Sequence, residues 1–248
     1  MQLHSDFSKR AVIFPEQYQF VASPLAGVSR MMLDRAGGEV ARATSIVRYA
    51  AGSGYSSHTH DGGEEILVLE GVFSDEHGDY PAGTYLRNPP GTSHQPFSRN
   101  GCSLLVKLWQ FSADDQQQLV IDTHAQQWRP GLVSGLSVLP LHEHDGVSTA
   151  LVRWAPHTHF NPHIHVGGEE ILVLEGLFCD ERGQYPAGSW LRSPRYSQHA
   201  PFTGAEGALI YVKVGHLGAG LLGDKFITTP IYHASLKWPG KTVPRLKL

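Results

Sequence analysis

Two short stretches of the chain carry histidine and glutamate side chains at the same spacing. The first reads H-T-H-D-G-G-E-E-I-L-V-L-E-G over residues 58–71, and the second reads H-I-H-V-G-G-E-E-I-L-V-L-E-G over residues 163–176. A further histidine lies 34 residues beyond the second histidine of each stretch. Imidazole nitrogen binds first-row transition metals, and one carboxylate adds a hard, charged ligand. The sequence therefore predicts two metal sites, whose expected ligands are His58, His60, Glu64 and His94 in the first and His163, His165, Glu169 and His199 in the second.

Strand geometry accounts for this spacing. His58 and His60 are two residues apart, so both side chains point to one face of a strand. The Asp-Gly-Gly sequence at 61–63 allows a turn that brings Glu64 back beside the histidines, and His94 arrives from a third strand. One His-x-His pair is commonly a solvated strand, but the full set written twice in register favours metal binding. Four ligands from three strands would leave one or two coordination positions open for water, oxygen or a substrate.

Four charged residues near the expected ligands have two interpretations each. Glu65 and Glu170 follow the expected glutamate ligands, so they should point to the opposite face of the strand. There they would support the site or lie at a strand edge rather than bind the metal. Arg87 and Arg192 occupy equivalent places before the last histidine, and each either reaches an anionic ligand in the cavity or holds a hairpin together.

The similarity between the two halves extends well beyond these residues. Y-P-A-G-T-Y-L-R-N-P at 80–89 corresponds to Y-P-A-G-S-W-L-R-S-P at 185–194. Upstream, T-S-I-V-R-Y-A at 44–50 corresponds to T-A-L-V-R-W-A at 149–155. A long period with only two copies indicates a duplicated domain rather than a solenoid of many repeats.

The local pattern is almost entirely that of β-strands. Short segments rich in Val, Ile, Leu and aromatic residues alternate with Gly, Pro and Asp turn signals, which is typical of antiparallel hairpins in a sandwich or barrel. The expected strands of the first copy are Ala43–Tyr49, Glu65–Glu70, Gly71–Ser74, Thr84–Arg87 and Leu104–Trp109. One short helix is predicted at Asp114–Val120, with Ser112 as its N-cap, in the linker at 113–127.

Size and composition fit two packed domains. The 248 residues, 41% of them hydrophobic, can form an N-terminal domain with its linker at 1–125 and a C-terminal domain with a tail at 126–248. The tail, from residue 216 on, has no counterpart in the first copy and would add an edge strand or wrap onto the neighbouring domain. A net charge of −3 gives no general attraction to nucleic acid or anionic membranes. Neither a signal peptide nor a membrane span is visible, so we expect a cytoplasmic protein.

These residues resemble the two motifs of the cupin superfamily. The first motif corresponds to Gly52-x5-His-x-His-x3-Glu64-x6-Gly71, and the second to Gly83-x5-Pro89-x-Gly91-x2-His94. The narrower pattern H-x-H-x-G-G-E-E-x-x-V-L-E-G-x-F, followed by D-E-x-G-x-Y-x-x-G-x-x-x-R-x-P, is similar to the cupin domain of ChrR-type anti-sigma factors. The resemblance implies an all-β fold of two tandem cupin barrels, each a double-stranded β-helix of the jelly-roll type. It also implies that three His and one Glu, the residues already named, hold the metal in each barrel.

The chain departs from the family pattern in two ways. ChrR-type regulators also carry an N-terminal helical module with a His/Cys zinc site that binds the sigma factor, and no such module is visible here. The resemblance therefore does not imply a sigma-factor partner. In the second copy, His157 stands in place of Gly52, and Arg195-Tyr196 replaces Pro90-Gly91. Tyr196 lies three residues before His199, so we expect it to narrow the mouth of the second cavity.

His157 and His159 have the strand parity of the second copy's ligands. They would line the same cavity, bind adventitious metal or lie in a loop. The loop is favoured because Asn161-Pro162 interrupts the strand.

Two classes of function fit this sequence. In the first, the protein is a sensor or binding module that takes up a small molecule or oxidant at its metal. In the second, it is a metal-dependent dioxygenase that cleaves a small β-diketone or hydroxylated aromatic ketone, with the metal carrying the chemistry. A purely structural zinc barrel is a third alternative. We expect two divalent metal ions per chain, Zn or Fe before Ni or Mn. A homodimer is left open, and ligand binding is expected mainly in the first copy.

Overall fold

The computed structural model describes residues 1–38 and 40–218, and the predicted role of the tail therefore concerns a segment outside the described residues from 219 on. In the described part, the only helical elements are two 3₁₀ helices of three residues each, η1 (Pro15–Gln17) and η2 (Thr123–Ala125). The prediction of an all-β protein is confirmed. No helix in this part of the chain is long and apolar enough to cross a membrane.

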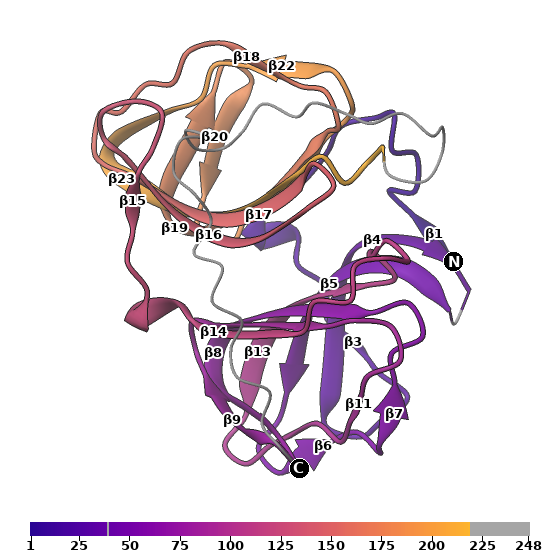
Figure 1. Cartoon of the computed structure of the whole chain (residues 1–248). Helices are drawn as coiled ribbons and strands as arrows, with labels where there is room; N and C mark the ends of the chain where they lie inside the picture. Colours follow the sequence, from indigo (N-terminus) through magenta and orange to yellow (C-terminus); the bar gives the residue numbers. More distant parts are fainter. Residues whose placement is uncertain (39, 219–248) are drawn as a thin grey trace.

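Two large antiparallel sheets organise the molecule, one in each half (Figure 1). The first sheet has eleven strands, which are β1 (Gln2–Leu3), β3 (Val21–Ala22), β4 (Val28–Gly37), β5 (Ala41–Tyr49), β6 (Ser53–Gly54), β8 (Glu64–Asp75), β9 (Gly78–Pro81), β10 (Thr84–Asn88), β12 (Phe97–Ser98), β13 (Cys102–Leu108) and β14 (Leu119–Asp122). The second has eight, which are β2 (Ala11–Ile13), β15 (Arg129–Pro130), β16 (Leu136–His144), β17 (Val147–Trp154), β19 (Glu169–Asp180), β20 (Gly183–Pro186), β21 (Trp190–Ser193) and β23 (Phe202–Val214). Each half also has a two-stranded ribbon, β7 (His58–Thr59) with β11 (Ser93–His94) and β18 (His163–His165) with β22 (Ser197–His199).

The long strand β8 joins two segments that the sequence suggested separately. Gly71 lies in its middle with a φ of +71°, and a β-carbon there would come within 2.2 Å of the Gly101 carbonyl oxygen. Only glycine tolerates both the conformation and the close approach. The register between β8 and β13 shifts at this place, next to Ser103 and Leu104. The glycine therefore lets one strand bend around the barrel instead of ending.

The helix predicted at Asp114–Val120 is wrong. The segment makes a turn, in which the Asp115 amide donates to the Ser112 carbonyl oxygen at 3.1 Å, and then runs into β14. Two interactions outweigh the helical preference of this short stretch. The buried Asp115 carboxylate accepts a hydrogen bond from Arg87, and β14 pairs with β10 along four residues.

One strand from the N-terminal part of the chain belongs to the sheet of the second half. Strand β2 pairs with β21, so Ala11–Ile13 form an edge of the second sheet although they precede every strand of the first copy's motif. The domain boundary at residues 125 and 126 stays a prediction, and β2 shows that the halves are interlocked across it.

Strand alternation divides the side chains between three cores. Ile66 and Val68 point into the first barrel, and Ile171 and Val173 point into the second. The intervening residues contribute to a third core that contains residues of both halves and lies between the sheets. Its members include Leu67, Leu105, Leu151, Leu172 and Tyr211. The two barrels therefore pack sheet against sheet, while the ribbons β7–β11 and β18–β22 lie at far ends of the molecule (Figure 1).

Two buried ion pairs cross this interface in reciprocal fashion. Lys213 of the second barrel donates to Glu65, and Lys107 of the first barrel donates to Glu170 at 2.6 Å. All four residues are at most 2% exposed. The expectation that Glu65 and Glu170 do not face the ligands agrees with this geometry, but they are interface residues rather than residues of a strand edge.

The paired arginines also serve the interface. Arg87 donates to Asp115 at 2.5 Å and lies 2.7 Å from Nδ1 of His142 in the second half. Arg192 of the second half donates to Asp34 of the first half at 2.9 Å. The alternative in which these arginines reach a ligand in the cavity is wrong, because both guanidinium groups are bound to partners across the barrels.

Candidate metal centres

Three elements bring the first set of expected ligands together. Ribbon β7–β11 places His58 directly opposite His94, and Glu64 is the first residue of β8, after the turn that begins at Asp61. The ligand atoms of His58, His60, Glu64 and His94 all lie within 4.8 Å of one another, so the four residues could hold one metal ion.

The outer ring nitrogen of each of these histidines is engaged elsewhere. Nδ1 of His58 donates to the Ser56 carbonyl oxygen at 3.0 Å, and Nδ1 of His94 lies 3.3 Å from the Asp75 carboxylate. Nδ1 of His60 lies 3.0 Å from the Thr92 hydroxyl. These contacts orient the rings and turn their Nε2 atoms toward Glu64.

The inner nitrogens lack protein hydrogen bonds. Nε2 of His60 lies 3.2 Å and Nε2 of His94 lies 3.5 Å from Oε2 of Glu64. Both nitrogens are buried and have no hydrogen-bond partner among the described residues. Buried polar atoms are rarely left without a partner. A metal ion bound among them would satisfy these nitrogens and the carboxylate at once.

The electrostatics of this group suit a cation. Burial raises the pKa of Glu64, but the close contact and charge of His60 and the charges of His94 and His58 outweigh it and lower the pKa. Burial lowers the pKa of His94, but the hydrogen bond to Asp75 and the charge of Glu64 raise it overall. The ionised Glu64 and Asp75 therefore favour positive charge in the position where a metal would sit.

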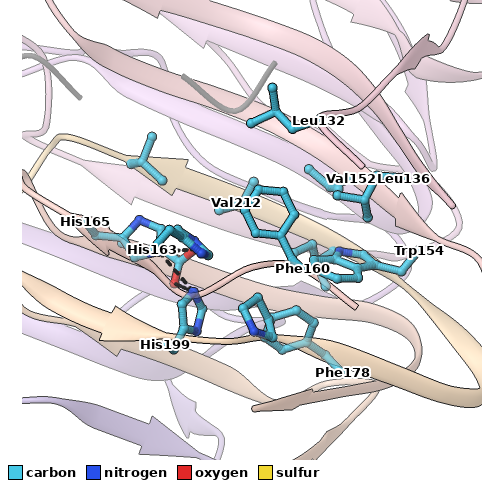
Figure 2. Close-up of a pocket in the computed structure, with 14 residues that line it drawn as sticks. Leu132, Leu136, Val152, Trp154, Phe160, His163, His165, Phe178, His199 and Val212 are labelled. Atoms are coloured by element: carbon cyan, nitrogen blue, oxygen red, sulfur yellow. Dashed lines mark hydrogen bonds and ion pairs between the residues drawn. The ribbon is translucent and has the colours of Figure 1, made fainter. Parts of the chain in front are cut away.

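The second set has a similar frame, although the group close enough to hold one ion contains its three histidines and not Glu169. Ribbon β18–β22 places His163 opposite His199, and the ligand atoms of His163, His165 and His199 lie within 4.8 Å of one another. The Glu169 carboxylate lies 3.4 Å from Nε2 of His165 and 3.6 Å from Nε2 of His199. The histidines gather at one end of the cavity, and the aromatic Trp154, Phe160 and Phe178 line its other side (Figure 2).

Protonation differs within the second set. Burial lowers the pKa of His165 to about 4, only partly opposed by Glu169, and burial also lowers the pKa of His163. Burial lowers the pKa of His199 as well, but the Glu169 and Asp180 carboxylates raise it overall. His163 and His165 are therefore kept neutral, the form that binds a metal.

Comparison with known proteins identifies the family. The model of the ChrR Cupin-like domain matches the chain twice, over residues 8–112 and 116–218. The chain belongs to the ChrR-like cupin family. No curated protein matches the chain.

Solved structures share the tandem cupin fold at low sequence identity. A suspected dioxygenase from Nostoc punctiforme superposes with a TM-score of 0.69 at 16% identity, covering 91% of this chain and 93% of that one. The pirin YhhW of Escherichia coli, solved with nickel(II), has a TM-score of 0.60 at 13% identity and covers 83% and 99%. Oxalate decarboxylase of Bacillus subtilis has a TM-score of 0.57 at 14% identity and covers 82% and 76%. At these identities the similarity concerns the fold.

The two cupin cavities differ in size. The cavity at the first histidine cluster has a volume of about 320 Å³, and the one at the second has about 70 Å³. Tyr49 and Tyr55 line the first cavity, and Trp154 and Phe160 stand at the corresponding places of the second. The exchange of a tyrosine for the larger indole of Trp154 fills part of the second barrel.

The predicted role of Tyr196 at the cavity mouth is wrong. Its side chain is 62% exposed and does not line the cavity. Tyr196 has a φ of +60° where Gly91 of the first cupin has +89°, and His157 has +57° where Gly52 has +75°. The second cupin therefore keeps the same turns with residues that adopt this conformation at a cost. A β-carbon at Gly91 would meet nothing within 4 Å, so the larger side chain simply points outward.

The loop interpretation of His157 and His159 agrees with the structure. Both are exposed and neither lines the cavity, and the His159 ring stacks on Phe202.

The sequence interpretation missed two residues that support the sites. Asp75 and Asp180 lie behind the last histidine of each set, at 3.3 Å from Nδ1 of His94 and 3.8 Å from Nδ1 of His199. Both also close a turn, because Asp75 accepts from the His77 amide and Asp180 from the Arg182 amide, each at 2.8 Å. The signal in the sequence that could have indicated this supporting role is an aspartate at the same place in both copies.

Proposed function

We propose that the protein is a metal-binding bicupin that takes up a small molecule or an oxidant at the metal site of its first barrel. Each barrel would hold one divalent transition-metal ion. The proposed ligands are the eight residues expected from the sequence, which are His58, His60, Glu64 and His94 in the first barrel and His163, His165, Glu169 and His199 in the second.

One observation carries the proposal. The four candidate ligands of the first barrel, three of them buried and His58 half-buried, form a group beside a cavity of about 320 Å³, which is within the range of small-molecule sites. Since three imidazoles and one carboxylate leave coordination positions open, a ligand in the cavity could reach the metal.

The chain itself offers little acid–base chemistry at this cavity. Besides the four candidate ligands, its ionisable lining residues are Arg30, Tyr49, Tyr55 and Asp61. Burial and the charge of Glu64 raise the pKa of Tyr49 far above 10, so this phenol stays protonated. A bound metal would supply Lewis acidity or redox chemistry, while the protein residues hold the ion, orient its ligands through Asp75 and enclose the small molecule.

The second candidate function is a metal-dependent dioxygenase acting on a small diketone or hydroxylated aromatic ketone. It is supported by the lining of the first cavity, where Asp61 is the one carboxylate besides Glu64 among the described residues, so the metal would carry most of the reaction. The structural neighbour from Nostoc punctiforme, a suspected dioxygenase, is in line with this candidate.

Metal analysis and oxygen consumption distinguish the candidates. Protein purified without a histidine tag should contain close to two transition-metal ions per chain. Iron together with oxygen uptake on a panel of diketones and aromatic ketones supports the dioxygenase. Metal-dependent binding of small molecules or a metal-centred response to oxidants, without turnover, supports the sensor. A protein that takes up no transition metal would reject both.

A further inference from the structure

Arg30 lines the cavity of the first candidate metal centre, although neighbouring residues on its strand belong to the apolar cores. On β4, Val28 belongs to the apolar core of the first barrel, and Met31 and Leu33 belong to the core between the barrels. Arg30 is two residues from Val28, so strand alternation turns it toward the barrel interior. It is among the residues that line the cavity with His58.

The Arg30 guanidinium lacks a partner within the described residues. The residue is half-buried, its Nε is buried and makes no hydrogen bond there, and it forms no ion pair with a described carboxylate. The buried Nε atoms of the interface arginines Arg87 and Arg192 also lack a hydrogen-bond partner among the described residues, but their terminal nitrogens donate to Asp115 and Asp34. Arg30 differs from them because it has no such carboxylate partner in the described part of the chain. A buried guanidinium nitrogen without an acceptor is costly, and its cost is removed when an anion binds.

The second barrel has no equivalent charge. Arg30 pairs with Val47 and Val138 pairs with Val152, and these two valines occupy the same place in the two repeats. Val138 therefore stands where Arg30 does, and it is fully buried. The second cavity is lined by apolar residues such as Leu132, Leu136 and Val152 on the side away from its histidines (Figure 2).

We propose that the first barrel selects small organic carboxylates, with Arg30 binding the carboxylate group. This inference rests on the proposed function, since the same cavity holds the metal site. Arginine presents a planar set of donors that matches a carboxylate. The walls supplied by Tyr49, Tyr55 and Phe73 would cover the apolar body of the ligand. The metal would provide a second point of attachment.

Matched ligand pairs test this proposal by calorimetric titration of the zinc-loaded full-length protein. The pair is benzoate and its neutral analogue benzamide, and acetylacetone serves as a neutral, metal-chelating probe. Wild-type protein should prefer benzoate, and Arg30→Val should lower its affinity for benzoate by about 10- to 100-fold, as expected for loss of hydrogen bonds to a charged group. Arg30→Val copies the residue found at Val138, and Arg30→Gln serves as a second variant that keeps a polar side chain.

Two controls accompany the titration. Arg48→Val removes a positive charge from an exposed residue of the neighbouring strand that does not line this cavity, and it should leave benzoate binding unchanged. Metal content measured for each variant shows that the site is loaded.

The outcomes separate this inference from the proposed function. If acetylacetone binds but benzoate binds no better than benzamide, or if both Arg30 variants retain benzoate affinity, the role of Arg30 is rejected and the metal-dependent cavity stands. If no probe binds to zinc-loaded wild-type protein, the carboxylate proposal fails and ligand binding at the first barrel fails with it.

Discussion

The two barrels share a frame of candidate metal ligands but differ in what surrounds it. In each, a two-stranded ribbon places two histidines opposite each other, and the adjacent long strand supplies a glutamate. The first cavity has about 320 Å³ and a charged lining residue, Arg30, while the second has about 70 Å³ and an apolar lining away from its histidines. The difference suggests that duplication preserved the metal ligands in both copies and that the capacity for a ligand was kept in one.

The interface between the barrels is nearly symmetric, in contrast to the two cavities. The glutamate next to each candidate metal ligand binds a lysine of the other barrel, through Lys213 to Glu65 and Lys107 to Glu170. Since neighbouring residues on a strand face opposite sides, one Glu-Glu dipeptide serves the metal site with its first residue and the interface with its second. The candidate metal site and the interface therefore both depend on this Glu-Glu dipeptide.

Breaking one interface pair should have the largest effect on stability. Glu65→Gln leaves the buried Lys213 without its counter-charge, which we expect to cost about 3–5 kcal/mol in the free energy of unfolding. Glu170→Gln should cost a similar amount, because Lys107, Trp190 and His216 all contact this carboxylate. Glu70→Gln, on the exposed part of the same strand, is the control and should stay within about 0.5 kcal/mol of wild type in urea denaturation.

The cost of Glu65→Gln should depend on pH. Burial raises the pKa of Glu65, but Lys213, Arg87 and Lys107 outweigh it and hold the pKa well below the ordinary 4.5. A carboxyl group with a depressed pKa contributes stability that is complete above its unfolded pKa and is lost as the pH falls toward its folded pKa. The difference between wild type and Glu65→Gln should therefore shrink below pH 4.5. A constant difference from pH 7 to 3 would contradict the assignment of this ion pair.

Removal of one metal ligand from each barrel tests whether both frames bind an ion. His60→Ala and His165→Ala should each lower the metal content by about one ion per chain at saturation, and each should lose the stability that the ion contributes. That contribution is about 2.7 kcal/mol when free metal exceeds its dissociation constant 100-fold. His77→Ala, an exposed histidine at a turn, should change neither quantity. Retention of both ions by the double variant would reject the ligand assignment.

The turn conformations of the second barrel predict a smaller, stabilising effect. Tyr196 adopts a φ of +60°, which costs a non-glycine residue about 1–2 kcal/mol. Tyr196→Gly should therefore stabilise the protein by about 1 kcal/mol, and Gly91→Ala in the first barrel should destabilise it by a similar amount. Thermal unfolding of the metal-loaded variants measures both. A loss of stability in Tyr196→Gly would mean that its exposed ring makes contacts that outweigh the strain.

Much of the fold could be predicted because the duplication repeats the same strand and turn pattern in both halves of the sequence. Hairpin patterns and the spacing of His58 and His60 are local, so strand geometry is enough to interpret them. The pairing of β2 with β21 could not be foreseen, because a three-residue strand carries no signal of a partner about 180 residues away. The helix prediction at Asp114–Val120 failed for a related reason, since the pairing of β14 with β10 outweighs a weak helical preference.

The clustering of the candidate ligands was predictable, but their surroundings were not. Histidine and glutamate at fixed spacing have few interpretations, whereas an arginine such as Arg30 is ordinary in sequence. Only the register of β4 against β5 shows that it faces the cavity. Likewise, the volume difference depends on how Trp154 and Phe160 pack, which no local pattern encodes.

The central claim is that ligand binding belongs to the first barrel, and a pair of substitutions tests it most directly. Glu64→Gln and Glu169→Gln keep the shape of each candidate ligand but remove its charge. Small-molecule affinity of the metal-loaded protein, measured by calorimetric titration, should fall about tenfold or more for Glu64→Gln and change little for Glu169→Gln. An equal effect of both substitutions, or a larger effect of Glu169→Gln, would contradict the account.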